Sequence, residues 1–340
     1  LQHDLEGARE NFKKAISLRP DFAMAEFNLA TTRLLQGDLA AGWGGYERRT
    51  AIDASPTQQY PGQQWQGEPL TGKSICLWCE QGFGDTLLFL RFAIELKQRG
   101  AERVLVLCQT ELADLLKQVP EIDQVLIAGD PQPDCDYQCA LLSVPRYLKT
   151  SLQTIPASVP FLTPPADRQE YWSRVLSELA GIKVGLNWCG NQSFPKNELR
   201  SISLESFLPL GELEGIQLIS LQQVNGREQI EPLEKEWNLW QPGLEYRAES
   251  GDFSETAALM QNLDLVITTD TAVAHLAGAL GVPVWILVSR LPEWRWLLER
   301  SDSPWYPTAR LFRQVELGDW QPVIQAVKAE LEQTLSEKSQ

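Results

Sequence analysis

The sequence predicts an α/β protein with two domains, each built on a parallel sheet, behind a short all-α segment. Strand-like and helix-like patterns alternate from about residue 72 onward, as they do where helices cover a parallel sheet. A proline-rich stretch, residues 155–165, interrupts this alternation, which then resumes. The expected parts are residues 1–50 (helical repeats), 51–71 (linker), 72–160 (first α/β domain), 161–320 (second α/β domain) and 321–340 (C-terminal helix).

The first part carries an internal repeat. Residues 4–8 (DLEGA) recur as residues 38–42 (DLAAG), an offset of 34 residues, which is the period of tetratricopeptide helix pairs. About one and a half repeats are present, fewer than a free-standing array needs. Because the chain begins at Leu1 without Met, we expect either that upstream repeats are missing or that this segment packs on the following domain. An unrelated helical hairpin is the alternative.

The remaining elements follow in order after a linker rich in Pro, Gly and Gln. Two α/β domains joined by a hinge leave a cleft at the carboxyl ends of their strands, where such folds bind ligands. The expected strands are Lys73–Glu80, Arg103–Cys108, Gln124–Ala128, Tyr137–Leu142, Lys183–Trp188, Gln217–Leu221, Leu265–Thr269 and Pro283–Val288. The expected helices are Thr86–Arg99, Glu111–Gln118, Asp167–Ala180, Leu204–Leu210, Ser254–Asn262, Thr271–Leu280 and Trp320–Gln333.

Composition narrows the classes of function. The net charge of −15 opposes general binding to nucleic acid or to an anionic membrane, and no apolar stretch is long enough to span a bilayer. No signal peptide is visible, and the six cysteines have no neighbouring histidine and poor spacing for a metal. We therefore predict a cytoplasmic protein with reduced thiols, no metal, no nucleic-acid partner and no membrane span.

The strongest local motif is a strand followed at once by a helix, residues 267–283 (ITTDTAVAHLAGALGVP). Free N–H groups at such a helix start favour a phosphate or diphosphate. Thr271 adds a hydroxyl, and His275 lies one turn further along the same face, beside Asp270 at the strand end. The alternative makes Asp270 only a helix cap and His275 a satisfied core residue.

This motif resembles the donor-site element D-[ST]-x-x-x-H of the ADP-heptose:lipopolysaccharide heptosyltransferase family, and more closely bacterial proteins that fuse tetratricopeptide repeats to such a glycosyltransferase. The resemblance covers roughly residues 65–335 and includes segments 80–86 (EQGFGDT), 184–191 (VGLNWCGN) and 292–307. It implies the GT-B fold, in which two Rossmann-like domains face a cleft and the second binds a nucleotide-diphosphate sugar. It also implies a metal-independent reaction, so the motif at residues 134–136 (DCD) is expected to be a turn.

The resemblance also implies roles for particular residues. Asp85 matches the family aspartate that acts as the base, and Gly82 and Gly84 are expected to let the backbone turn so that Asp85 faces the acceptor. Lys196 and Arg200 follow a strand in a polar loop, where they would hold the donor diphosphate, with surface solvation as the alternative.

Nucleotide recognition is expected just past the strand that ends at Leu221, at Gln222 and Gln223. Asp252 would reach the ribose or sugar, or would simply begin a helix. Repeat-fused relatives often carry a histidine where this chain has Phe194, which leaves catalytic competence open. Four tryptophans near the expected cleft would stack on a sugar or lie in the core: Trp294, Trp296, Trp305 and Trp320.

The sequence thus predicts a metal-independent glycosyltransferase (a hexosyl- or heptosyltransferase) with a nucleotide-diphosphate sugar as donor and no further cofactor. The helical repeats make a protein or peptide acceptor plausible. A lipid- or polysaccharide-directed heptosyltransferase-like enzyme is the nearest alternative. A catalytically inactive repeat adaptor that binds nucleotide or a protein partner, and a nucleotide-sugar epimerase, are the others.

Overall fold

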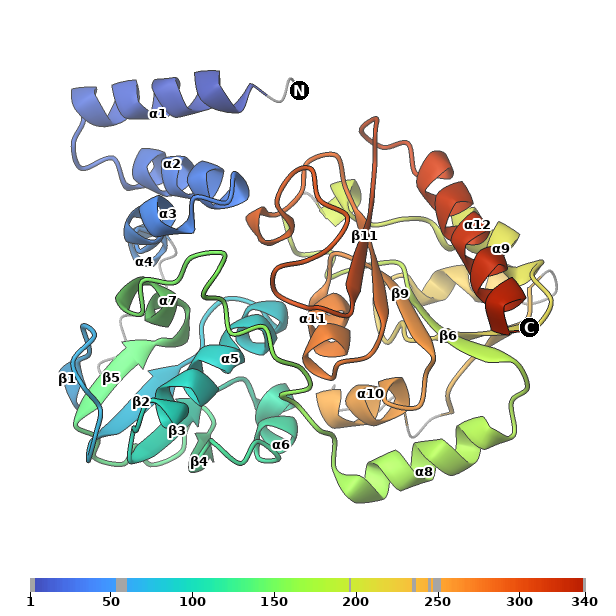
Figure 1. Cartoon of the computed structure of the whole chain (residues 1–340), viewed down its shortest axis with the longest axis horizontal. Coiled ribbons are helices and arrows are strands. Elements are labelled where there is room, and N and C mark those ends of the chain that lie inside the picture. Colours follow the sequence, from blue (N-terminus) through green and yellow to red (C-terminus); the bar gives the residue numbers. More distant parts are fainter. Residues whose placement is uncertain are drawn as a thin grey trace.

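The computed structural model describes residues 4–52, 60–195, 197–233, 237–243, 246 and 252–338. These residues form three parts, which Figure 1 shows as a helical segment at the N-terminal end and two α/β domains side by side. The helical segment lies over the first domain, and the C-terminal helix covers the second. Both sheets are parallel throughout, so the predicted α/β class with parallel sheets is confirmed.

Two helices of the helical segment, α1 and α3, begin with the same kind of N-terminal cap. Asp4 accepts a hydrogen bond from the Gly7 N–H at 2.8 Å, and Asp38 accepts one from the Ala41 N–H at 3.2 Å, so the repeated DLxxx sequence is a repeated helix cap. The segment packs on the first domain, where the Trp43 indole N–H donates to the Thr150 carbonyl at 2.8 Å. Its helices are α1 (Leu5–Leu18), α2 (Ala23–Leu35), α3 (Leu39–Tyr46) and α4 (Arg49–Ile52).

The first domain has a sheet with strand order β1-β5-β2-β3-β4 in the described residues. Its strands are β1 (Gln63–Gln64), β2 (Ser74–Trp78), β3 (Arg103–Leu107), β4 (Gln124–Leu126) and β5 (Tyr137–Ala140). Its helical elements are α5 (Phe83–Gln98), η1 (Thr110–Leu112), α6 (Ala113–Leu116), η2 (Leu141–Ser143) and α7 (Val144–Tyr147).

The second domain has strand order β11-β10-β9-β6-β7-β8 in the described residues. Read from the β8 edge, with β6 counted as the first strand of the domain, this order is 3-2-1-4-5-6, which is the Rossmann order. The strand sequence runs outward in opposite directions from the point between β6 and β9. Its strands are β6 (Ile182–Asn187), β7 (Ile216–Ser220), β8 (Leu239–Trp240), β9 (Leu265–Thr269), β10 (Val284–Val288) and β11 (Ala309–Arg313). Its helical elements are α8 (Ala166–Ser177), η3 (Asn197–Leu199), η4 (Leu204–Phe207), α9 (Leu208–Gly211), η5 (Arg227–Gln229), η6 (Glu231–Leu233), α10 (Phe253–Met260), α11 (Ala272–Ala279), η8 (Trp294–Trp296) and α12 (Gln321–Lys338).

The two domains contact each other beyond the chain that joins them. Helix α5 of the first domain packs against α11 of the second. The connecting stretch passes the end of α11, where the N–H groups of Phe161 and Leu162 both donate to the Ala279 carbonyl. These contacts fix the carboxyl ends of the two sheets opposite each other.

The structure departs from the predicted elements in three places. Within the predicted linker, residues 53–59 lie outside the described residues, while Gln63–Gln64 form β1 and pair with β5 at the sheet edge. Strands β8 and β11 were not predicted. Helix α5 begins at Phe83 rather than Thr86, because the Asp85 carboxylate accepts a hydrogen bond from the Gly82 N–H and caps the helix three residues earlier.

Candidate active site

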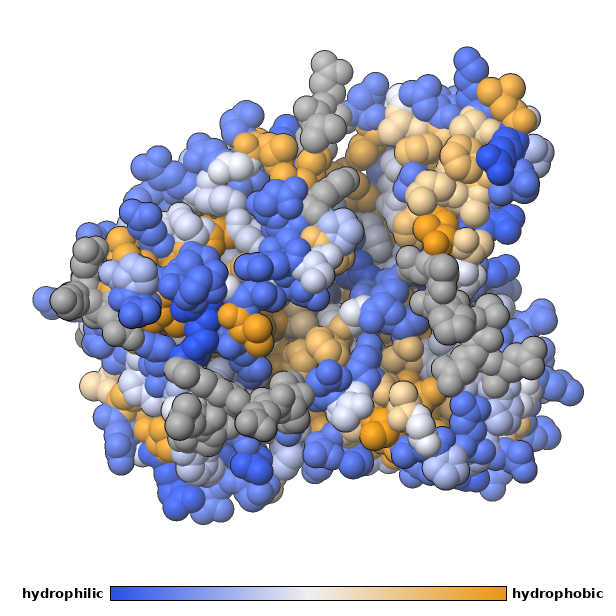
Figure 2. Space-filling view, turned by 180° about the vertical axis from the view of Figure 1, so that it is seen from behind, coloured by the Kyte–Doolittle hydropathy of each residue, from blue (hydrophilic) through white to orange (hydrophobic). Residues whose placement is uncertain are grey.

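A cavity of about 1090 Å³ lies among the three parts of the molecule. It sits at the carboxyl ends of β6 and β9, where the strand order of the second sheet reverses, and α5 closes its other side. From behind, Figure 2 shows the surface hollowed between the helical segment and the second domain. Residues from α2, α3, the β2–α5 loop, the loops after β6, β7 and β9, and η8 line the cavity, including Asn28, Tyr46, Asp85, Arg200, Gln223, Asp270, Thr271, His275 and Arg295.

The helix start at α11 forms one wall. Thr271 is its N-cap and accepts a hydrogen bond from the Val273 N–H at 3.3 Å, so the cap is Thr271 and not Asp270. Asn187, at the end of β6, accepts hydrogen bonds from the hydroxyls of Thr268 at 3.1 Å and Thr271 at 3.0 Å. Burial raises the pKa of the Asp270 carboxyl. The strand-to-helix junction is therefore rigid and holds a buried carboxyl beside the helix N-terminus.

His275 lies in the same wall and is uncharged near neutral pH. Burial, together with the charges of Arg295, Arg91 and Arg200, lowers its pKa well below the ordinary value. Its Nδ1 hydrogen-bonds the Tyr306 hydroxyl at 3.1 Å, and its ring stacks on Trp296 with centroids 5.2 Å apart. His275 thus contributes a hydrogen-bonding group, not a positive charge, to this wall.

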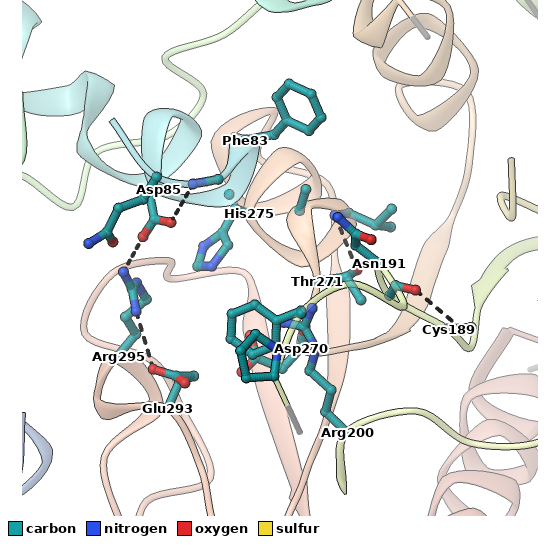
Figure 3. Close-up of a pocket in the computed structure, with 18 of the residues that line it drawn as sticks. Phe83, Asp85, Cys189, Asn191, Arg200, Asp270, Thr271, His275, Glu293 and Arg295 are labelled. Atoms are coloured by element: carbon teal, nitrogen blue, oxygen red, sulfur yellow. Dashed lines mark hydrogen bonds and ion pairs between the residues drawn. The ribbon is translucent and has the colours of Figure 1, made fainter. Parts of the chain in front are cut away.

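The opposite wall is the first turn of α5, which carries Asp85 (Figure 3). One carboxylate oxygen accepts the Gly82 N–H at 3.1 Å, and the other is ion-paired with Arg295. The predicted glycine turn is wrong in its detail, because Gly82 and Gly84 have ordinary backbone angles and the left-handed residue is Gln81, with φ of 63°. A Cβ on Gly84 would lie 2.8 Å from His275 Cδ2, so this glycine allows α5 to approach α11.

Arg200 reaches the cavity from the loop after β6. Its Nη1 donates to the Asp270 carbonyl at 2.9 Å, and its guanidinium lies 4.0 Å from the centre of the Phe194 ring. It is therefore held beside the α11 N-terminus, as an arginine that binds a diphosphate would be. Lys196, the other predicted cation, lies outside the described residues.

The two predicted glutamines differ in what they contact. The Gln222 side-chain oxygen accepts hydrogen bonds from Asn187 and from two backbone N–H groups, and its nitrogen donates to the Cys189 and Asn225 carbonyls. Its amide is thus engaged in holding the loops together. Gln223 lines the cavity and donates to Thr256 at 2.7 Å.

Other candidates take structural roles. Asp252 caps α10 by accepting the Ser254 N–H at 2.8 Å. Asp136 accepts hydrogen bonds from the Ser74 N–H and hydroxyl and from Lys73, each at 2.9 Å, which ties β5 to β2. In the described residues no group of three or more His, Cys, Asp and Glu is placed to hold a metal. The four tryptophans that were expected near the cleft are all buried, and of these only Trp294 lines the cavity: Trp294, Trp296, Trp305 and Trp320.

Sequence reasoning missed Arg295 and Glu293 in η8 and its approach. Arg295 is only 8% exposed and meets Asp85, which is 210 residues earlier in the chain. Glu293 lies 3.5 Å from the other side of the same guanidinium. An arginine between two tryptophans in a segment already matched to the family was a usable signal, but its partner follows only from the packing of η8 on α5.

The comparisons with known proteins relate this arrangement, two parallel sheets facing a cavity with a helix N-terminus in one wall, to glycosyltransferases. Residues 250–288, from just before α10 to the end of β10, match the profile of glycosyltransferase family 9 (heptosyltransferase). This match, which contains Asp270, Thr271 and His275, supports a glycosyltransferase.

The chain is also similar to particular proteins. It is 30% identical to protein FlbA of Caulobacter vibrioides over 92% of this chain, and spans 55% of that relative's length. Solved structures with the same fold include a family 9 glycosyl transferase from Veillonella parvula (TM-score 0.56, 13% identity, 78% of this chain and 91% of that one). Another is Escherichia coli ADP-heptose LPS heptosyltransferase II (TM-score 0.52, 15% identity, 78% and 100%). A third is Escherichia coli heptosyltransferase WaaC with ADP (TM-score 0.51, 12% identity, 76% and 99%).

None of the described helices has the length and apolar character needed to cross a membrane.

Proposed function

We propose that the protein transfers a sugar from a nucleotide-diphosphate donor to an acceptor bound in the cavity between its two α/β domains. The observation that carries this proposal is the meeting of two walls. The α11 N-terminus, inside the segment that matches family 9, faces Asp85 on the first turn of α5.

The donor diphosphate would lie against the α11 N-terminus. Backbone N–H groups there favour an anion, and Arg200 supplies positive charge on the same side. Thr271 and neutral His275 would add hydrogen bonds, and Gln223 lines the part of the cavity where the nucleoside would extend. With arginine and a helix start in this position, the proposed reaction uses no metal to neutralise the leaving group.

The reaction is a displacement at the anomeric carbon. The acceptor hydroxyl loses its proton to Asp85 as its oxygen forms the new bond to the sugar. The bond from that carbon to the diphosphate oxygen breaks at the same centre, and the nucleoside diphosphate leaves with the electron pair. Asp85 then returns the proton to solvent. Oxygen, sugar and proton are all accounted for without a redox partner.

The helical segment supports a proposal about the acceptor. Phe27, Asn28 and Thr31 of α2 line the cavity, so an acceptor approaching Asp85 passes along this helix. If the segment is the last part of a tetratricopeptide array, a protein or peptide acceptor fits this position. We include the GT-B fold and a cytoplasmic location in the proposal, the latter supported by six unpaired cysteines.

Nucleotide binding and transfer test this function separately. A ligand at 100 times its Kd stabilises the native state by about 2.7 kcal/mol, so ADP, GDP or UDP should raise Tm by several degrees. Asp85→Asn should lower transfer by about 10²–10⁴-fold without weakening donor binding. Asp302→Asn, an exposed change remote from the cavity, is the matched control. No stabilisation by any nucleoside diphosphate would contradict the proposal.

The solved neighbours named for ADP-heptose favour a second version of the function, in which ADP-heptose is the donor and a lipid or polysaccharide is the acceptor. ADP-heptose is therefore the first donor to test, with a peptide and a saccharide acceptor compared side by side. Substituting Asn28 in α2 should impair transfer to a peptide more than transfer to a saccharide if the first version holds.

A further inference from the structure

Arg295 occupies an unusual position in the cavity. It comes from η8 of the second domain, yet its guanidinium is ion-paired with Asp85 of the first domain (Figure 3). Glu293 lies 3.5 Å from its Nη1, and its guanidinium carbon is 4.7 Å from the centre of the Trp294 ring. Trp294 in turn packs against Trp43 of the helical segment, so η8 contacts all three parts of the molecule.

Each oxygen of the Asp85 carboxylate has a partner in this arrangement. The Gly82 N–H donates to one oxygen, and the Arg295 guanidinium lies against the other. A general base must lie within hydrogen-bond reach of the proton that it takes. Release of the Arg295 contact would therefore clear that oxygen of Asp85 for the proton of an acceptor hydroxyl.

The described side chains that line the cavity carry more acidic than basic groups, which does not suit a diphosphate unless the arginines are available to it. Its acidic side chains are Asp85, Asp270 and Glu293, and its arginines among the described residues are Arg200 and Arg295. Arg200 contacts the Asp270 backbone carbonyl, not a carboxylate, so its charge is open to a ligand. Arg295 is neutralised by Asp85. An entering diphosphate competes with Asp85 for Arg295, since guanidinium binds phosphate and carboxylate with the same paired geometry.

We propose that Arg295 is a second diphosphate-binding residue and that donor binding transfers it from Asp85 to the diphosphate, which frees Asp85 to act as the base. This inference rests on the proposed function and adds a sequence of events to it, in which donor binding comes before release of the base. Without donor, Asp85 is held by Arg295. With donor, Arg295 supports the leaving diphosphate and Asp85 faces the acceptor, so base and leaving-group charge are made ready together.

A double-mutant cycle on nucleoside diphosphate binding tests this exchange. The probes are ADP, GDP and UDP, measured by calorimetric titration against the full chain. Asp85→Asn removes the competing carboxylate with little change in shape, and should tighten binding by about three- to tenfold. Arg295→Gln should weaken binding by tenfold or more. In the Arg295→Gln background, Asp85→Asn should have no effect, because no exchange remains.

The result that would overturn the exchange is an equal effect of Asp85→Asn in both backgrounds, which would mean simple removal of a negative charge. An unchanged Kd in Asp85→Asn overturns it as well. Arg295→Lys, which keeps the charge but not the paired geometry, serves where Arg295→Gln fails to fold, and should retain part of the affinity with a smaller dependence on Asp85. If none of the nucleotides binds wild type, the proposed function itself fails, a result distinct from either of these.

Discussion

At the residue scale, the candidate site depends on a close approach between two helices. Gly84 lies in the first turn of α5, and His275 lies on α11 directly opposite. A side chain at position 84 would occupy the space of the imidazole, which is itself fixed by Tyr306 and Trp296. Because these two contacts hold the imidazole in place, the glycine sets the distance between α5 and α11.

We predict that Gly84→Ala lowers transfer activity by at least tenfold and destabilises the fold. Alanine is the better helix former, by about 0.5–1 kcal/mol, but its Cβ would lie 2.8 Å from His275 Cδ2, closer than carbon atoms pack. Gly44→Ala is the control, since this helical glycine has nothing within 4 Å of the added carbon. Denaturant unfolding and donor turnover are the measurements. Equal stabilisation of both variants would contradict the assigned role.

The sequence pointed to Asp270, Thr271 and His275 because a strand followed at once by a helix is a local pattern. It could not show that Arg295 pairs with Asp85, because that contact follows only from the packing of η8 on a helix 210 residues earlier. The amide of Gln222 shows the converse. The sequence predicted a role in nucleotide recognition for this residue after β7, but its five hydrogen bonds to neighbouring loops follow from tertiary packing alone.

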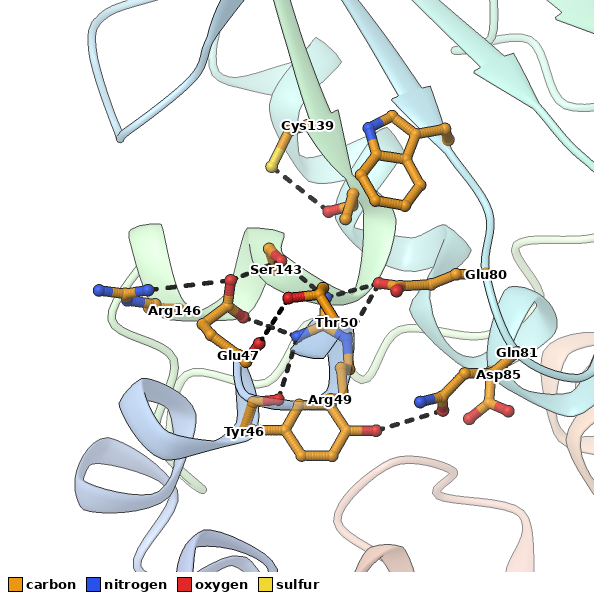
Figure 4. Close-up of polar contacts among 12 residues, drawn as sticks. Tyr46, Glu47, Arg49, Thr50, Glu80, Gln81, Asp85, Cys139, Ser143 and Arg146 are labelled. Carbon is orange, nitrogen blue, oxygen red and sulfur yellow. Dashed lines mark hydrogen bonds and ion pairs between the residues drawn. The ribbon is translucent and has the colours of Figure 1, made fainter. Parts of the chain in front are cut away.

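At the element scale, α4 joins the helical segment to the loop that leads into α5, the helix that carries Asp85. Arg49 is 1% exposed and donates to Glu47 at 2.8 Å, to the Ser143 hydroxyl at 2.7 Å and to Glu80 at 3.0 Å (Figure 4). Burial raises the pKa of the Glu80 carboxyl in spite of this arginine. Glu80 stands directly before Gln81, the residue in the left-handed conformation that leads into α5.

We predict that Arg49→Ala destabilises the protein by about 3–5 kcal/mol, because it leaves the Glu80 charge buried and unpaired. The neighbouring Arg48→Ala removes an exposed pair with Glu26 and should cost about 0–1 kcal/mol. Chemical denaturation at neutral pH compares the two. A similar loss for both arginines would mean that the Arg49 network does not hold the helical segment to the first domain.

Sequence patterns predicted some strands well and missed others. Strand β9 was predicted to the residue, because an apolar run ends sharply in polar side chains. The strands β1, β8 and β11 were not, since the first two are only two residues long and the third has two arginines among its five residues. Short edge strands form because an adjacent strand has free backbone groups for hydrogen bonding, and the sequence of the short segment does not reveal that neighbour.

At the scale of the whole molecule, one buried arginine joins the two domains. Arg91 of α5 is 2% exposed and donates to the Pro156 carbonyl at 2.9 Å and the Trp305 carbonyl at 2.6 Å. Its guanidinium carbon lies 4.7 Å from the centre of the Tyr306 ring, and the hydroxyl of the same tyrosine hydrogen-bonds His275. Burial lowers the pKa of Arg91, whose charge is offset by carbonyls and ring faces.

We predict that Arg91→Met loosens the contact between the domains and destabilises the protein by about 2–4 kcal/mol, because methionine fills much of the volume but leaves both carbonyls without their charged donor. Unfolding followed by fluorescence and by circular dichroism should then show two transitions in place of one, as the domains unfold separately. Amides near Trp305 should exchange faster. Arg99→Met, on an exposed turn of the same helix with a Glu95 pair at 2.6 Å, should keep wild-type behaviour. A single unchanged transition in Arg91→Met would show that Arg91 is not needed to hold the two domains together.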